Sequence, residues 1–178
     1  GLGIAFDRPD RYGWMPGKGA DTEASFRRIN AARTASNDTL AFLHHTASNA
    51  ILSAREVREA AERGGGDFRR PARGIEALQT VAALIRGGLA TRIYYVSFGG
   101  FDTHANQAGP HDNLLKRFSQ ELARFQQTLR RDGTAPQVLT LVFSEFGRRV
   151  TENASGGTDH GTAAPLLLVG DGVRPGLH

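Results

Sequence analysis

Residues 99–111 read Gly-Gly-Phe-Asp-Thr-His-Ala-Asn-Gln-Ala-Gly-Pro-His and hold two histidines, one carboxylate and two amides. The stretch is too rich in glycine and proline for regular structure, so it is predicted to be a loop. It follows an apolar strand candidate, Ile93–Phe98, and precedes a long amphipathic helix candidate. Polar groups on a loop between two well-patterned elements are typical of binding and catalysis. We therefore expect this loop to belong to a functional site.

The strand before this loop is one of three that the sequence predicts. Residues 91–98 are dense in β-branched and aromatic side chains, as is typical of a strand. Residues 137–143 and 164–169 are near-continuous apolar runs, a pattern typical of strands that are buried on both faces of a parallel sheet. The three runs together favour a mostly parallel sheet.

Helical patterns fill much of the remaining sequence. Apolar residues recur at helical spacing over residues 36–63, and a second helix is predicted over residues 71–86, with its proline in the first turn. A third helix, after the histidine-rich loop, carries an apolar stripe from Leu114 to Leu129. The order of helices and strands predicts an α/β fold, a three-layer sandwich with a mostly parallel sheet between helices.

The length and composition place limits on the class of protein. A chain of 178 residues is within the range of one domain, and we predict a single domain over residues 1–178, irregular over 1–35 and α/β over 36–178. The apolar runs are far shorter than a membrane span, so none is expected. The absence of cysteine excludes disulfides and thiolate metal ligands.

The charge of the chain limits its partners. A net charge of +4 and a pI of about 10.1 come mostly from arginines that are scattered along the sequence. A nucleic-acid-binding protein more often shows a basic stripe with a recognisable motif, so we expect no nucleic-acid partner. A solvated basic surface is compatible with a small anionic substrate. The oligomeric state is left open.

Three loops carry histidines and carboxylates in a pattern that indicates a metal site. Two of them come directly after predicted strands, so their side chains should emerge at the same edge of a parallel sheet. The third, at residues 157–161, precedes the last strand and must fold back over that edge. The candidate ligands are Asp102, His104, His111, Glu145, Asp159 and His160. Such ligands suit zinc, manganese or iron, and this number of ligands can hold one or two divalent ions.

Each of these residues also has a purely structural explanation. Asp102 and Asp159 can each stabilise a turn through bonds to the backbone, and Glu145 can form a surface ion pair with Arg148. These explanations weaken when taken together, because three histidines that lie in glycine-flanked loops beside carboxylates would then have no role. A serine hydrolase is a weaker alternative, because the segment around Ser144 lacks the first glycine of a nucleophile elbow.

The same loops resemble the signatures of a known family. The motifs are Gly-Gly-Phe-Asp-Thr-His-Ala-Asn-Gln at 99–107, Ser-Glu-Phe-Gly-Arg at 144–148, and Glu-Asn followed by Gly-Thr-Asp-His-Gly within 152–161. In this order they are similar to those of the bacterial domain-of-unknown-function 1501 (DUF1501) family, and the resemblance covers residues 90–176. The family is grouped by similarity with the alkaline-phosphatase-like superfamily of phosphatases, sulfatases and phosphomutases. The resemblance implies a large, parallel-rich sheet between helices and a two-metal site.

The resemblance also implies roles for individual residues. Asp102, with His104 or His111, resembles the Asp and His ligands of one metal ion. His160 resembles the superfamily's late metal-binding histidine, and Asp159 is expected to join it. These roles are implied by the match of motifs.

The resemblance has one departure from the superfamily's pattern and two further implications. Glu145 stands where the superfamily often has Asp-His after a buried strand, and Phe146 departs from that pattern. The superfamily's nucleophile and an early Asp ligand lie N-terminal to the matched region, so the chain is expected to be the C-terminal portion of a larger domain, with no nucleophile of its own. Intact family members often carry a twin-arginine export signal, which implies a periplasmic or exported setting.

The predicted function is a metal-dependent hydrolase of phosphate or sulfate esters, with zinc as the favoured ion. Arg148 is expected to stabilise the anionic group, because its guanidinium offers paired donors to phosphate or sulfate oxygens. The alternative is a non-catalytic binding or accessory protein of the exported proteome that keeps the metal site. A third option, a structural domain without metal, predicts that chelators leave stability unchanged.

Overall fold

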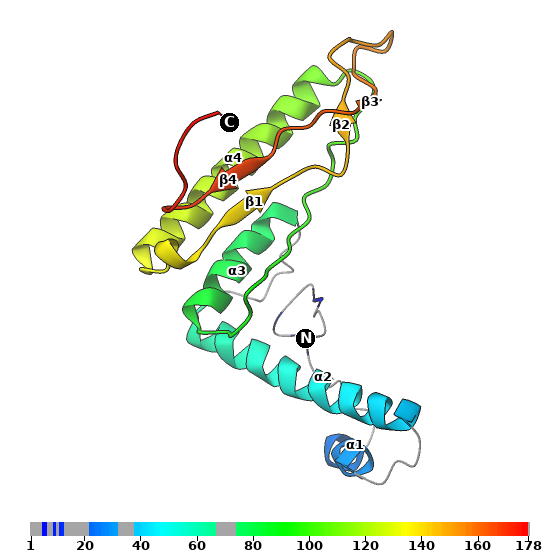
Figure 1. Cartoon of the computed structure of the whole chain (residues 1–178), viewed down its shortest axis with the longest axis vertical. Helices are drawn as coiled ribbons and strands as arrows, with labels where there is room; N and C mark the ends of the chain where they lie inside the picture. Colours follow the sequence, from blue (N-terminus) through cyan, green and yellow to red (C-terminus); the bar gives the residue numbers. More distant parts are fainter. Residues whose placement is uncertain are drawn as a thin grey trace. The chain divides into compact units, whose positions relative to one another are not determined.

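The computed structural model describes residues 5–6, 9, 11–12, 22–31, 38–66 and 74–177. Residues 36–37 and 71–73, at the starts of two predicted helices, lie outside the described residues. The chain forms two compact units, whose helices and strands are labelled in Figure 1.

The first unit comprises Gly1–Arg73 and Ala83–Arg92. Its helices are α1 (Thr22–Ala31), α2 (Asp38–Arg63) and the second half of α3 (Ala77–Arg86). Apolar periodicity predicts the helices at α2 and α3, and both predictions are confirmed over the described residues. α1 packs against α2 and lies in the part of the chain that the sequence predicts to be irregular. An ion pair one helical turn apart, Glu23 to Arg27 at 2.7 Å, supports α1.

The C-terminal ends of α2 and α3 touch backbone to backbone, at what we call the helix junction (residues 60–65 and 83–88). A Cβ atom on Gly64 would overlap the carbonyl oxygen of Ala83, and a Cβ atom on Gly87 would overlap the carbonyl oxygen of Ala60. Glycine is the residue that permits so close an approach. The junction is surrounded by small or apolar buried side chains, which form the core of this unit.

Two arginines close the helix junction reciprocally. The Nε–H of Arg63 donates to the carbonyl of Gly87 at 2.9 Å, and the Nε–H of Arg86 donates to the carbonyl of Gly64 at 2.7 Å. The last carbonyls of a helix lack partners within the helix. Each arginine therefore satisfies a carbonyl at the end of the other helix.

The second unit comprises Gly74–Ala82 and Ile93–His178. Its elements are η1 (Gly74–Glu76), the first turns of α3, α4 (Ala108–Arg131), η2 (Ala135–Gln137), β1 (Thr140–Val142), β2 (Gly147–Arg148), β3 (His160–Gly161) and β4 (Leu167–Val169). α4 confirms the helix that the apolar stripe predicts. Phe125 and Leu129 are buried on it, and Phe118 stacks on Phe98 with ring centroids 6.1 Å apart. These side chains anchor α4 within the unit.

The described strands form two small antiparallel sheets, so the predicted three-layer sandwich with a mostly parallel sheet is wrong. β1 pairs with β4, with Leu141 opposite Leu168, and β2 pairs with β3, with Arg148 opposite His160. Figure 1 shows the two pairs at different positions along α4. The β2–β3 pair carries the polar loops, and the β1–β4 pair is apolar.

The physical reasons for this difference lie in the connections and in the exposure of the strands. A parallel pair needs a long crossover, usually a helix, whereas β1 and β4 are joined by loops and the β2–β3 pair. Residues 93–98 alternate between exposed and half-buried side chains, as in a strand, but none of these described residues joins a ladder. Leu141 is 51% exposed and Leu168 is 49% exposed, so the apolar runs are not buried on both faces.

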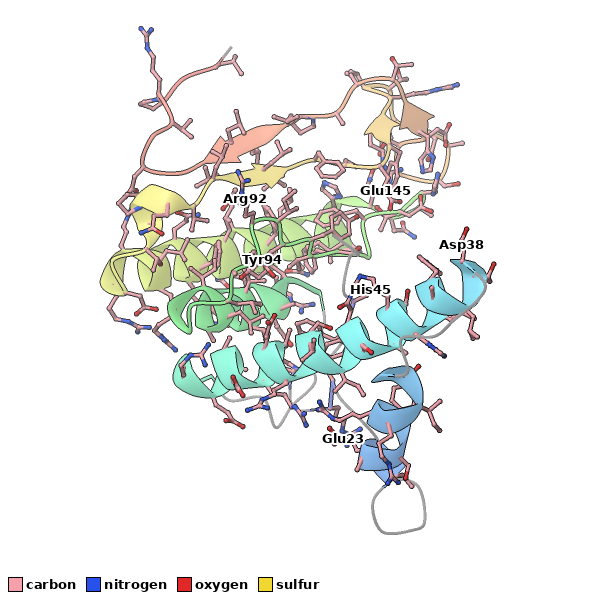
Figure 2. The ribbon with its side chains drawn as sticks, turned by 60° about the horizontal axis from the view of Figure 1, so that its bottom comes forward. Glu23, Asp38, His45, Arg92, Tyr94 and Glu145 are labelled. Carbon is pink, nitrogen blue, oxygen red and sulfur yellow. The ribbon has the colours of Figure 1, made fainter. Side chains whose placement is uncertain are left out.

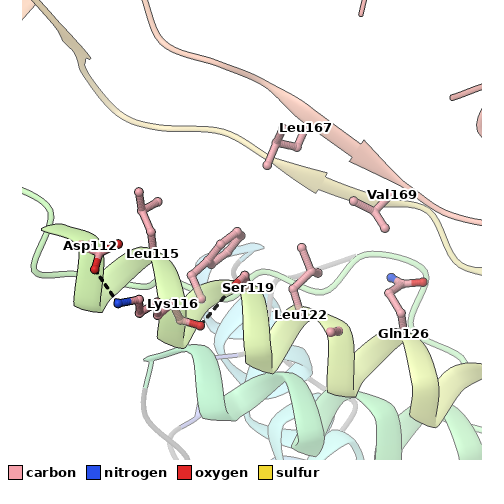
Figure 3. Close-up of a pocket in the computed structure, with 10 residues that line it drawn as sticks. Asp112, Leu115, Lys116, Ser119, Leu122, Gln126, Leu167 and Val169 are labelled. Carbon is pink, nitrogen blue, oxygen red and sulfur yellow. Dashed lines mark hydrogen bonds and ion pairs between the residues drawn. The ribbon is translucent and has the colours of Figure 1, made fainter. Parts of the chain in front are cut away.

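An open apolar groove of about 560 Å³ lies between α4 and β4 (Figure 3). Leu115, Phe118 and Leu122 line it from α4, and Leu167 and Val169 line it from β4. No helix among the described residues combines the length and the apolar character that crossing a membrane requires.

Candidate metal centre

The histidine-rich loop and the β2–β3 pair bring three potential metal ligands together. Asp102 and His104 lie on the loop, and His160 is the first residue of β3. The Nε2–H of His160 donates to Oδ1 of Asp102 at 2.7 Å, and Nδ1 of His104 lies 3.5 Å from the same oxygen. One ligand atom from each of the three residues lies within 4.8 Å of the others. We call these three residues the Asp-His-His cluster.

Aromatic contacts fix the imidazole ring of His160. Phe146 stacks on it with ring centroids 4.2 Å apart and an interplanar angle of 13°. His104 lies against it at 4.9 Å and 38°. The guanidinium of Arg148 lies over the Phe146 ring, 5.1 Å from its centroid. These contacts set the plane of the His160 ring and thereby direct its Nε2 toward Asp102.

Arg148 also ties the two chain segments of the cluster together. It donates one hydrogen bond from Nη1 to the carbonyl of Thr158 and another from Nη2 to the carbonyl of Phe101, the latter at 2.6 Å. Phe101 directly precedes Asp102, and Thr158 lies two residues before His160. Arg148 therefore holds both segments in place. Its role in stabilising an anion stays a prediction.

The same two segments are joined further along by hydrogen bonds, at what we call the loop junction (residues 104–107 and 153–158). The backbone N–H groups of Asn106 and Gln107 donate to the carbonyls of Ser155 and Gly156, both at 2.9 Å. The hydroxyl of Thr158 donates to the Gln107 side chain at 2.9 Å. The loop that bears His160 is thus attached to the loop that bears Asp102.

The surroundings of Asp102 favour its ionised form. The hydrogen bond from His160 holds the pKa of the Asp102 carboxyl below its usual value. Desolvation opposes this effect in part, and the charges of His160, His104 and Arg148 lower the pKa further. Asp102 is therefore ionised near neutral pH. An ionised carboxylate beside two imidazoles is a donor set that suits a divalent transition metal.

The comparisons with known proteins give one match. The family described as "Protein of unknown function (DUF1501)" matches residues 18–178. The chain belongs to the DUF1501 family. The resemblance of the three motifs to DUF1501 is therefore confirmed, and the match extends well beyond the residues that carry those motifs. No curated protein and no solved structure matches this DUF1501 chain significantly.

The other three predicted ligands of the DUF1501 chain lie outside the Asp-His-His cluster. His111 is on the first turn of α4, where its ring meets the edge of Phe101 at 5.5 Å and its buried Nδ1 has no hydrogen-bond partner. Glu145 is exposed at the turn between β1 and β2 (Figure 2). Asp159 accepts a hydrogen bond from Asn153 at 3.0 Å. Ligand roles for these three residues stay predictions.

Two further residues of the DUF1501 chain contact the Asp-His-His cluster in ways that the sequence does not predict. Phe146 is the ring that stacks on His160, and Asn153 forms hydrogen bonds to both loops. Both lie inside the motifs that carry the resemblance, so their position in the sequence indicates that they belong near the site. Their roles depend on contacts between loops, which a motif does not reveal.

Proposed function

We propose that the Asp-His-His cluster binds one divalent metal ion, with zinc favoured. The observation that carries this proposal is the convergence of one carboxylate oxygen and two imidazole nitrogens within 4.8 Å of one another. Zinc binds such ligands at about 2.0–2.2 Å in tetrahedral geometry, which separates neighbouring ligand atoms by roughly 3.4 Å. The 3.5 Å between Asp102 and His104 is close to that value, whereas the 2.7 Å between Asp102 and His160 is the distance of their hydrogen bond. To bind the ion, His160 would give up this hydrogen bond and ligate through an unprotonated Nε2.

We further propose that the protein is a metal-dependent hydrolase of phosphate or sulfate esters. Three protein ligands leave a coordination position open, as in catalytic rather than structural zinc sites. When bound, such an ion acts as a Lewis acid toward a phosphoryl or sulfuryl oxygen. Arg148 would hold the anionic group with the guanidinium N–H groups that do not bond to Thr158 and Phe101. No residue of this chain is assigned as a nucleophile.

A specific observation favours the alternative, a non-catalytic metal-binding or accessory protein. The cluster faces solvent, with side chains that are 47% to 64% exposed. Small-molecule sites are usually concave, yet the apolar groove along α4 has none of the three ligands in its lining. Metal binding and turnover are therefore tested separately.

Two broader assignments belong to the same proposal. Membership of the alkaline-phosphatase-like superfamily is supported by the three motifs, and not by the arrangement of the described strands. An exported, periplasmic location is supported only by the family resemblance. Neither assignment is needed for the experiments below.

The first experiment measures metal content and zinc affinity, by elemental analysis and by isothermal titration calorimetry. We expect the wild-type chain to bind one equivalent of zinc and an Asp102→Ala/His160→Ala double variant to bind none. The matched control is His45→Ala, because His45 is an exposed histidine on α2 whose ring bonds to Asn49 (Figure 2). A double variant that binds zinc as tightly as the control would contradict the ligand assignment.

A chelator adds a stability measurement to this experiment. Binding of zinc to the folded chain raises the free energy of unfolding by RT ln(1 + [Zn]/Kd), so removal of zinc should lower the melting temperature. The effect should be absent in the double variant. A melting temperature that a chelator leaves unchanged would favour a structural domain without metal.

Turnover is then tested on p-nitrophenyl phosphate and p-nitrophenyl sulfate. Hydrolysis by the zinc-loaded chain that disappears in Asp102→Ala would support the hydrolase. Stoichiometric zinc without hydrolysis of either ester would support the non-catalytic alternative for this chain.

A further inference from the structure

We infer that Asn153 is a positioning residue of the metal centre, an inference that rests on the proposed function. Its side-chain amide makes four hydrogen bonds, two as donor and two as acceptor, and it lies on the loop that bears His160, against the loop that bears Asp102 and His104. This equals the number of hydrogen bonds that an asparagine amide normally makes. Asn153 itself is not a candidate ligand, because both halves of its amide are occupied.

The donor half of the amide links one loop to the other. Nδ2 donates to the backbone carbonyl of His104 at 3.0 Å and to Oδ1 of Asp159 at 3.0 Å. His104 is a member of the cluster, and Asp159 directly precedes His160. One amide group therefore binds the backbone of one histidine of the cluster and the side chain of the residue that precedes the other.

The acceptor half shapes the turn that makes this link possible. Oδ1 accepts hydrogen bonds from the backbone N–H groups of Ser155 and Gly157, at 2.9 and 3.1 Å. The turn places the buried Gly157 against the backbone of His104, where an added Cβ would lie 2.5 Å from the carbonyl oxygen. The two loops are thus in direct backbone contact beside His104.

This arrangement has a consequence for metal binding. Asp102 and His160 are 58 residues apart in sequence, so their approach depends on contacts between the loops. Residues that orient metal ligands typically change metal affinity by about 10- to 100-fold when they are mutated. We therefore expect Asn153 to increase zinc affinity by keeping both histidines in place before the ion arrives.

The test compares Asn153→Asp with wild type. Aspartate keeps the acceptor for Ser155 and Gly157 but loses both Nδ2 donors, and it places a second carboxylate beside Asp159. We expect zinc to bind about 10- to 100-fold more weakly, with a changed visible absorption spectrum of the cobalt-substituted chain. The control is Asn113→Asp, which introduces the same charge at an exposed position of α4. Equal zinc affinity of the wild type and Asn153→Asp would overturn the inference.

A second pair of variants separates positioning from general loss of structure. In Asn153→Asp/Asp159→Asn the new amide at position 159 can donate to the new carboxylate at position 153, so part of the zinc affinity should return. Asp159→Asn alone is measured beside it, so that any effect of position 159 itself on zinc affinity is known separately. A double variant no better than Asn153→Asp would overturn the inference.

A readout without metal distinguishes failure of this inference from failure of the proposed function. In the metal-free chain, Asn153→Asp should shift the imidazole ¹⁵N signals of His104 and His160 and leave those of His45 unchanged. A wild-type chain that binds no zinc would contradict the proposed metal site, and shifted signals would still support the positioning role. Unshifted His104 and His160 signals would contradict the positioning role itself.

Discussion

The helix junction and the loop junction connect distant parts of the chain by the same means. In both, glycine lets two backbones touch: Gly64 and Gly87 at the helix junction, and Gly157 at the loop junction. In both, a side chain of one segment donates a hydrogen bond to a backbone carbonyl of the other segment. Two arginines do this at the helix junction, and Asn153 does it at the loop junction.

The two junctions differ in what surrounds them. Ala60, Ala83 and Leu84 at the helix junction are 0%, 3% and 1% exposed, so this contact is part of an apolar core. The loop junction lies beside the solvent-facing Asp-His-His cluster, in which Asp102 is 64% exposed. The first contact mainly supports the folded state, and the second mainly orders polar groups that stay available to a ligand. The comparison therefore predicts that stability and metal affinity can be changed separately.

The largest effect on stability is expected for Gly87→Ala. The new Cβ would overlap the carbonyl of Ala60, and neither backbone can move without separating the two helices. We expect a loss of about 3 kcal/mol or more in the free energy of unfolding, because the strain falls inside a packed core. The measurement is urea denaturation followed by far-ultraviolet circular dichroism.

The control for this prediction is Gly172→Ala, because a Cβ at Gly172 would have open space around it. Zinc affinity of the folded fraction should stay at the wild-type value in both variants. Equal urea midpoints for Gly87→Ala and Gly172→Ala would show that the backbones of α2 and α3 are not in close contact at Gly87.

The reverse pattern is expected for Gly157→Ala. Its Cβ would lie 2.5 Å from the carbonyl oxygen of His104, so the two loops must move apart. Few buried side chains depend on this contact, and we expect a loss of only about 1 kcal/mol in the free energy of unfolding. Zinc affinity should fall by about tenfold or more, because the histidines lose their alignment.

Calorimetric titration with zinc, beside urea denaturation, checks this prediction. Gly99→Ala is the control, since it lies at the start of the same loop and its Cβ would meet no atom within 4 Å. A Gly157→Ala chain that is strongly destabilised but binds zinc normally would reverse the assignment of the two junctions.

These contrasts also explain which parts of the fold could be predicted from the sequence. Three helices were predictable because their signal is local: apolar periodicity marks α2, α3 and α4, whereas α1 was not predicted. The partner of a strand is not a local property. Residues 137–143 and 164–169 formed the short strands β1 and β4, but residues 91–98 joined no ladder among the described strands. The parallel sheet was predicted on the assumption that the apolar runs are buried on both faces. In the structure, side chains of these runs are exposed.

The site was partly predictable for a related reason. Glycine-flanked histidines and carboxylates marked loops whose side chains converge in the structure, and three of the six candidates meet there. His111 was expected on a loop, but α4 begins at Ala108 and therefore includes it. The ring of His111 contacts Phe101. Which side chains face one another depends on contacts such as that of Phe146 on His160. Such contacts between distant segments leave no periodic trace in a single sequence.

The smallest effect is expected for an exposed ion pair on α2 whose two residues lie outside both junctions, although Glu59 also lies 3.9 Å from Arg63. Arg55 and Glu59 are 2.7 Å apart, with side chains that are 68% and 46% exposed. The hydrogen bond from Arg55 holds the pKa of Glu59 below its usual value, and the charge of Arg55 adds to the effect. Exposed pairs of this kind contribute little to stability because water and salt screen them.

The sign of its pH dependence follows from that lowered pKa. The stabilisation is fully present above the pKa of an unfolded glutamate, about 4.3, and is lost as the pH falls through the lower value of the folded state. Glu59→Gln should therefore have a slightly lower urea midpoint than wild type at about pH 7, and the difference should close below about pH 4. A difference as large as that of Gly87→Ala, or one that persists in acid, would mean that α2 depends on surface charge rather than on its contact with α3.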